Sequence, residues 1–177
     1  MSCGLKTYGA ALAALAPGTA ATFAIAELDG SATKKITLNR IGVSATKLTA
    51  AAVQDVRLTK LSAISTGGTA TTATNVPFAS NYGVAATAVF RGFTVAPTGG
   101  GTVIGAIACE KILTDVITTL MGAIQLVVWD FSNLPVGSRP TLLTAAEAFA
   151  VDFNGATPAH AQSMDVYAWW SESPLNS

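Results

Sequence analysis

Two stretches near the end of the chain, AFAVDFNG (residues 148–155) and MDVYAWW (residues 164–170), decide the fold class. In the first stretch, Phe149, Val151 and Phe153 alternate with small or acidic residues, and the Asn-Gly pair that follows is a turn signal. The second stretch alternates in the same way. Because successive side chains of a β-strand point to opposite faces, a period of two predicts β-strands. We therefore expect Phe149, Val151 and Phe153 to lie in the core.

Alternation with a period of two also runs upstream, beginning at residue 21. Ile36 and Leu38 share one parity, whereas Ile41 and Val43 occupy the other, which predicts a β-bulge near Asn39 and Arg40. Further strands are predicted at residues 56–59, 85–95, 103–110 and 124–131, the last of them central and buried on both faces.

Two segments interrupt this strand pattern. The Thr/Gly/Ala-rich residues 65–80 predict a long polar loop. The apolar spacing from Ile112 to Met121 favours a short helix, but β-branched residues inside it disfavour one, so helix and strand both stay open.

Regular short strands with few helical signals predict an all-β protein. We expect a jelly-roll-like sandwich of two sheets, with about eight strands, spanning residues 21–172. An Ala-rich N-terminal arm, residues 1–20, precedes this β-sandwich domain, and a polar C-terminal tail, residues 173–177, follows it.

The arm has an apolar spacing of its own. Leu5, Tyr8, Leu12 and Leu15 recur every three or four residues, which predicts a short amphipathic helix that ends at Pro17-Gly18. Because its apolar stripe is thin, the helix needs a surface to lie against. We expect it to pack on another chain or on the outside of the sandwich, and not within the sheet core.

The charge of the chain restricts its partners. The 177 residues include ten Lys plus Arg and ten Asp plus Glu, so charged residues make up 11% of the chain, against about 25% in ordinary domains. A chain without a basic surplus lacks the charge that binds nucleic acid, and no apolar run is long enough to cross a membrane. Free monomers usually carry more surface charge. We therefore expect partner subunits to cover much of the surface.

Residues capable of catalysis are few and scattered. His160, the only histidine, lies close in sequence to Ser163 and Asp165, but the three crowd one loop and strand start without a nucleophile elbow. Glu27 and Asp29 could face one calcium ion, although a strand end followed by an Asp-Gly turn explains them equally well. We expect no enzyme activity, no catalytic residue, no cofactor and no metal site.

The remaining candidates have ordinary structural explanations. Gly99-Gly100-Gly101 lacks the Lys-Ser/Thr ending of a phosphate-binding loop and is expected to form a turn. Cys3 and Cys109 are expected to be reduced thiols, with Cys109 acting as a small buried hydrophobic residue.

Adjacent tryptophans end the aromatic stretch. Neighbours in a strand face opposite ways, so one of Trp169 and Trp170 should fill the core while the other points outward or into a partner. Tyr167 shares the face of Trp169. This aromatic pair predicts packing in the core or between subunits, or else a platform for stacking sugars.

The chain resembles small β-sandwich structural proteins of tailed bacteriophages. The resemblance covers about residues 53–172 and rests on three stretches: residues 56–69, which lead from a strand into a Gly/Thr-rich loop; residues 142–151, with Glu147 before an apolar strand; and the aromatic strand at residues 164–172. Ala146 stands where that pattern has glycine. The resemblance implies a virion component and no catalytic residues.

These observations predict a non-enzymatic cement protein that decorates and stabilises a phage capsid through subunit contacts. Its expected partners are the major capsid protein and itself, as a homotrimer, and its expected location is the virion, assembled in the host cytoplasm. The alternative is a carbohydrate-recognition module of a tail fibre or receptor-binding protein, with a glycan as partner. The candidate interface residues are Leu5, Tyr8, Leu12, Leu15, Tyr167 and Trp169.

Overall fold

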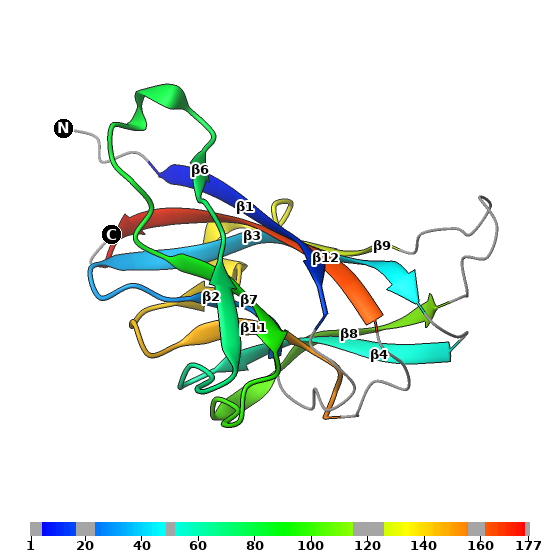
Figure 1. Cartoon of the computed structure of the whole chain (residues 1–177). Coiled ribbons are helices and arrows are strands. Elements are labelled where there is room, and N and C mark those ends of the chain that lie inside the picture. The colour runs from blue at the N-terminus through cyan, green and yellow to red at the C-terminus, as the bar shows by residue number, and fades with distance from the viewer. Residues whose placement is uncertain (1–4, 17–23, 49–51, 115–125, 156–161, 176–177) are drawn as a thin grey trace.

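A computed structural model describes residues 5–16, 24–48, 52–114, 126–155 and 162–175. Within these ranges the chain forms twelve β-strands, two short 3₁₀ helices and no α-helix. The strands make two antiparallel sheets packed face to face (Figure 1). The predicted all-β, two-sheet sandwich is therefore confirmed.

The first sheet has the order β10-β3-β12-β1-β6, and β9 also pairs with β3. Its longest ladder joins β3 to β12 along their whole lengths. Its strands are β1 (Lys6–Leu15), β3 (Lys34–Leu48), β6 (Val76–Pro77), β9 (Leu126–Asp130), β10 (Thr141–Leu142) and β12 (Gln162–Pro174).

The second sheet has the order β5-β7-β2-β11-β4-β8. Strands β2 and β11 lie at its centre, and both are buried throughout. Its strands are β2 (Ala24–Asp29), β4 (Ala52–Leu61), β5 (Thr69–Thr72), β7 (Val89–Val95), β8 (Val103–Thr114) and β11 (Ala148–Asp152).

The pairing of the strands is that of a jelly roll. The first four strands pair with the last four major strands in reverse order, as β1 with β12, β2 with β11, β3 with β9, and β4 with β8. Successive pairs fall alternately in the two sheets, which gives β1-β12-β3-β9 and β2-β11-β4-β8. Eight strands wrapped in this way are the jelly-roll architecture expected from the sequence.

An excursion between β4 and β8 adds three strands to this framework. β5 and β7 extend the second sheet beyond β2, and β6 crosses to pair with β1 in the first sheet. The short helices η1 (Ser80–Tyr82) and η2 (Val136–Ser138) lie in loops. The segment 65–80, expected to be a loop throughout, therefore contains β5 and β6, because pairing with β7 and β1 organises their Thr- and Val-containing backbone.

The core lies between the sheets and follows the predicted alternation. Phe149, Val151 and Phe153 are fully buried, as expected, and so is Trp170. The predicted bulge is also present, since Trp169 pairs with Arg40 but Trp170 pairs with Leu38, leaving Asn39 as the extra residue.

The N-terminal segment differs most from its prediction. Lys6–Leu15 is strand β1 and not a helix, and it lies between β12 and β6 within the sheet. Tyr8, Leu12 and Leu15 point into the core, where they are 1%, 8% and 2% exposed. The helix prediction is wrong, and so is the expected position outside the sheet core. Pro17-Gly18 lies outside the described residues.

Three smaller expectations also fail or go untested. Ile112 to Thr114 belongs to strand β8, and the rest of the segment to Met121 lies outside the described residues. Strand β9 pairs with β3 at the side of the sheet and exposes Leu126 at 57%, so it is not a central strand buried on both faces. Cys109 is exposed because β8 pairs only with β4 in the described chain; Cys3 lies outside that part.

Candidate functional site

The outer face of the first sheet carries rows of side chains that cross several strands. One row runs Asp130, Arg40, Trp169, Gly9 and Val76, from β9 to β6. The next row, Val128, Gly42, Tyr167 and Ala11, contains no charge. Because strand residues two apart share a face, both rows lie on the side opposite the core.

Glycines in the neighbouring strands make room for the two aromatic rings. A Cβ atom on Gly42 would lie 2.3 Å from Cε1 of Tyr167, and one on Gly9 would lie 3.1 Å from Cδ1 of Trp169 and 2.6 Å from Cε1 of Phe78. The rings therefore lie down over the sheet, covering strand backbone that has no side chain of its own. This is the packing by which aromatic residues stabilise glycine in sheets.

Trp169 is held on both sides. The guanidinium carbon of Arg40 lies 4.9 Å from the centre of the Trp169 ring, and Arg40 is paired with Asp130 at 3.4 Å. On the other side, Phe78 meets Trp169 edge to face, with ring centres 5.5 Å apart. Hydrogen bonds from Ser132, with lesser help from Arg40 and Arg139, lower the pKa of Asp130. The carboxylate therefore stays ionised and balances Arg40.

A groove of about 380 Å³ lies beside these rings. Tyr167 and Trp169 are inclined at 49° to each other, and Phe78 stands at 80° to Trp169. Its lining residues come from β1, β12, β6 and the turns beside β6: Gly9, Ala10, Ala11, Thr74, Val76, Phe78, Tyr167 and Trp169. Its size is within the usual range for small-molecule sites. We call it the aromatic groove.

The structure separates the six residues singled out from the sequence. Tyr8, Leu12 and Leu15 lie in the core, and Leu5 is exposed at the start of β1. Tyr167 and Trp169 share the outer face with ring centres 5.8 Å apart, as predicted, while Trp170 fills the core.

Phe78, Val76 and Arg40 were missed. Phe78 and Val76 lie in a segment expected to be loop. The pairing of Arg40 with Trp169 depends on the register between β3 and β12, so no local sequence pattern could have revealed it.

A charged cluster lies on the outside of the second sheet. Arg91 contacts Glu27 at 2.7 Å and Asp29 at 3.0 Å. Ser65, from the loop after β4, donates a hydrogen bond to Glu27 through its hydroxyl and another through its backbone N–H. Glu27 is completely buried. The two carboxylates considered for calcium therefore share a guanidinium, which ties the loop after β4 to strands β2 and β7.

Asp29 should make the protein less stable as the pH rises towards neutrality. Burial raises the pKa of Asp29 to about 7; Arg91 opposes this effect and Glu27 adds to it. Between about pH 4 and pH 7 the folded chain keeps a proton that the unfolded chain has lost, so the free energy of unfolding falls by at most about 4 kcal/mol across this window. Asp29→Asn should flatten that decline in urea titrations at a series of pH values.

Asp55→Asn provides the matched control for this pH dependence. Asp55 is a surface partner of Lys111, whose hydrogen bond lowers the pKa of Asp55. The Asp55→Asn variant should therefore show the same decline in the free energy of unfolding between pH 4 and pH 7 as the wild type. A wild-type stability that is constant across that window would contradict the assignment to Asp29.

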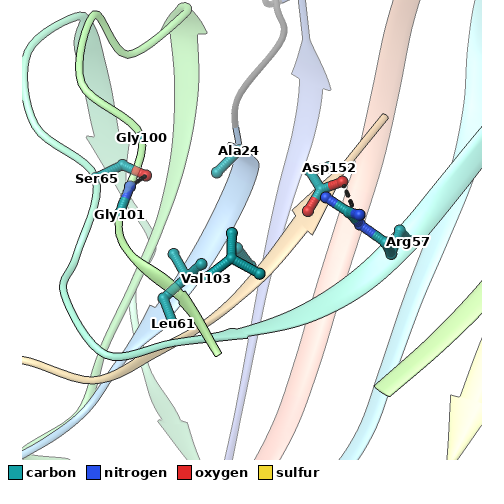
Figure 2. Close-up of a pocket in the computed structure, with 9 residues that line it drawn as sticks. Ala24, Arg57, Leu61, Ser65, Gly100, Gly101, Val103 and Asp152 are labelled. Carbon is teal, nitrogen blue, oxygen red and sulfur yellow. Dashed lines mark hydrogen bonds and ion pairs between the residues drawn. The ribbon is translucent and has the colours of Figure 1, made fainter. Parts of the chain in front are cut away.

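A smaller cavity on the second sheet is less suited to a ligand. It has a volume of about 50 Å³ and lies between Ser65 with Gly101 on one side and Arg57 with Asp152 on the other (Figure 2). Arg57 and Asp152 are paired at 3.0 Å, and Asp152 also accepts a hydrogen bond from Thr59. These polar groups are thus bonded to one another, and the volume holds only a few water molecules.

In the described ranges no three His, Cys, Asp or Glu residues cluster as metal ligands would, and no helix there has the length and apolar character to cross a membrane. His160 lies outside those ranges. Comparison with protein-family models, curated proteins and solved structures gives no match.

Proposed function

We propose that this chain is a non-enzymatic structural protein of a tailed-phage virion, and that it decorates and stabilises the capsid as a homotrimer. The family resemblance supports the virion role. Strand β9 provides the main evidence for a docking surface. Its residues Leu126 and Val128 point outward, while Val127 and Trp129 pack inward. We take these two adjacent outward apolar side chains as the centre of the surface that a partner covers.

The character of the neighbouring side chains supports the same proposal. The β3 residues that pair with Val128 and Leu126 are small, namely Gly42 and Ser44. Small side chains lose little conformational entropy on association. These small side chains would let a capsid subunit approach Leu126 and Val128 closely. The whole chain has a formal net charge of zero, so long-range attraction contributes little to that contact.

Charges placed on β9 should strongly weaken attachment to particles. Leu126→Glu together with Val128→Glu would put unpaired carboxylates into the contact, and we expect roughly a hundredfold loss of affinity. The measurement is rebinding of purified protein to virions stripped of it, followed by sedimentation. Wild-type rebinding should change little between low and physiological salt.

Two observations check this experiment. Glu110→Lys, an exposed substitution on β8, should rebind like wild type. The proposal is wrong if mass spectrometry of purified virions finds no trace of this protein, or if modest salt releases it. Sedimentation of the free protein tests the homotrimer.

A carbohydrate-recognition module of a tail fibre is the second candidate. The specific observation in its favour is the aromatic groove with Tyr167 and Trp169 in its wall. Specific binding of a glycan by the free protein, together with its location at the tail, would favour this alternative.

A further inference from the structure

The aromatic groove combines ring surfaces with exposed backbone. Its floor is formed by Gly9, Ala10 and Ala11, and its walls by the inclined rings of Tyr167, Trp169 and Phe78. These rings are already fixed by glycine contacts and by Arg40. A ligand would therefore meet a formed surface and would not have to order it, which lowers the entropic cost of binding.

Polar groups of strand β1 open into the same groove. The ladder between β1 and β6 ends at Gly9 and Val76. The N–H and C=O of Thr7 point to the β6 edge, since they bond to Tyr82 and Phe78. By strand alternation the N–H and C=O of Ala11 point to that edge too, past the last pair. An aliphatic side chain in the groove would leave these groups without a partner, which is costly.

The exposed edge is too short to add a strand from another protein. After Leu12 the register between β1 and β12 shifts, and Ala14 has a φ of 56°. Regular pairing thus stops within about one residue of Ala11, whereas strand addition needs a run of main-chain hydrogen bonds. A compact ligand with hydroxyl groups fits both the short edge and the ring walls.

The balance of charge further defines the ligand. Arg40 lies next to Trp169 but is neutralised by Asp130, and the residues that line the groove carry no charge. An anionic ligand would find no unpaired cation there. We propose that the aromatic groove is a binding site for a neutral pyranose sugar, with the apolar face of the sugar against those parts of Tyr167, Trp169 and Phe78 that line the groove, and its hydroxyls towards Ala11 and Thr74.

Sugar binding is a property beyond capsid docking, and the two can be tested separately. The groove lies on the β12–β1–β6 side of the sheet, whereas the docking proposal depends on β9. The Leu126→Glu, Val128→Glu variant should thus lose particle attachment and keep sugar binding. Conversely, sugar binding can fail while attachment to particles stays intact.

The experiment is calorimetric titration of the full chain with maltohexaose, cellopentaose and chitopentaose, and with an oligogalacturonate as the acidic comparison. At least one neutral oligomer should bind. Trp169→Ala should weaken that binding roughly tenfold or more, Trp169→Phe should weaken it less, and Leu126→Ala should leave it unchanged. Phe78→Ala is a second test, because Phe78 is 53% exposed and its loss does not endanger the fold.

Three results would overturn the proposal. They are the absence of binding for every neutral oligomer at millimolar concentration, binding of the acidic oligomer alone, and binding that persists in both Trp169→Ala and Phe78→Ala. Binding of an apolar peptide in the groove in place of any sugar would assign it to a protein partner. Circular dichroism of each variant establishes that the sandwich is folded.

Discussion

A variant that lacks residues 1–15 is expected to lose the cooperative unfolding transition and the β-sheet circular-dichroism spectrum. Strand β1 pairs with β12 from Lys6 to Leu15 and puts Tyr8, Leu12 and Leu15 into the core. Burial of three such side chains is worth roughly 5–9 kcal/mol. This is comparable with the whole stability of a typical domain, about 5–15 kcal/mol.

Point substitutions test whether the buried side chains of β1 are what stabilise the fold. Leu12→Ala should lower the free energy of unfolding by about 2–5 kcal/mol. The outward Ala11→Ser should change it little, since Ala11 is exposed. If the truncated chain keeps its spectrum and a sharp transition, β1 is dispensable and the segment acts as an arm after all.

The second large effect is expected at Glu172. Glu172 is 5% exposed, and its carboxylate accepts hydrogen bonds from the backbone N–H groups of Thr87 and Ala88, the Thr87 hydroxyl and Nε1 of Trp170. Glu172→Ala would leave these donors without an acceptor. We expect the free energy of unfolding to fall by about 3–5 kcal/mol.

Urea titration of three variants tests this role. Glu172→Gln keeps the shape and one acceptor oxygen, so it should lose less than Glu172→Ala. The exposed Glu110→Ala should match wild type. Equal stability of Glu172→Ala and wild type would mean that water replaces the carboxylate, and that the loop before β7 is not anchored to β12.

The sequence predicts strands well where the period of two is unbroken. Phe149 to Phe153 and Met164 to Trp170 follow this rule. Phe149, Val151 and Phe153 lie in the core as predicted, although the opposite face of β11 is buried as well. The bulge at Asn39 was also predictable, because a change of parity within one apolar run requires an extra residue.

Strand β1 was predicted as a helix because its irregularity gives the apolar residues a helical spacing. Tyr8 and Leu12 lie on one face of the strand by simple alternation, but the irregularity between Leu12 and Leu15 returns Leu15 to that same face. The resulting spacing of four and then three is that of an amphipathic helix. No local signal distinguishes the two, since the decision rests on pairing with β12 far along the chain.

The candidate site was predictable only in part. Alternation places Tyr167 and Trp169 together on an outer face, and the structure confirms this. The residues around these two rings come from β3, β1 and β6. Which of them lie next to the rings depends on the register between strands far apart in the sequence. Glu172 was likewise missed, because its partners Thr87 and Ala88 lie in a loop over eighty residues away.

The contacts between glycines and aromatic rings on the outer sheet have an evolutionary consequence. A side chain at position 9 would collide with Phe78 and crowd Trp169, and one at position 42 would collide with Tyr167. Loss of a ring would leave bare backbone, and gain of a side chain would displace a ring. In homologous sequences, residue 9 should therefore change together with residues 78 and 169, and residue 42 together with residue 167, so that a larger residue replaces either glycine only where its aromatic partners have gone.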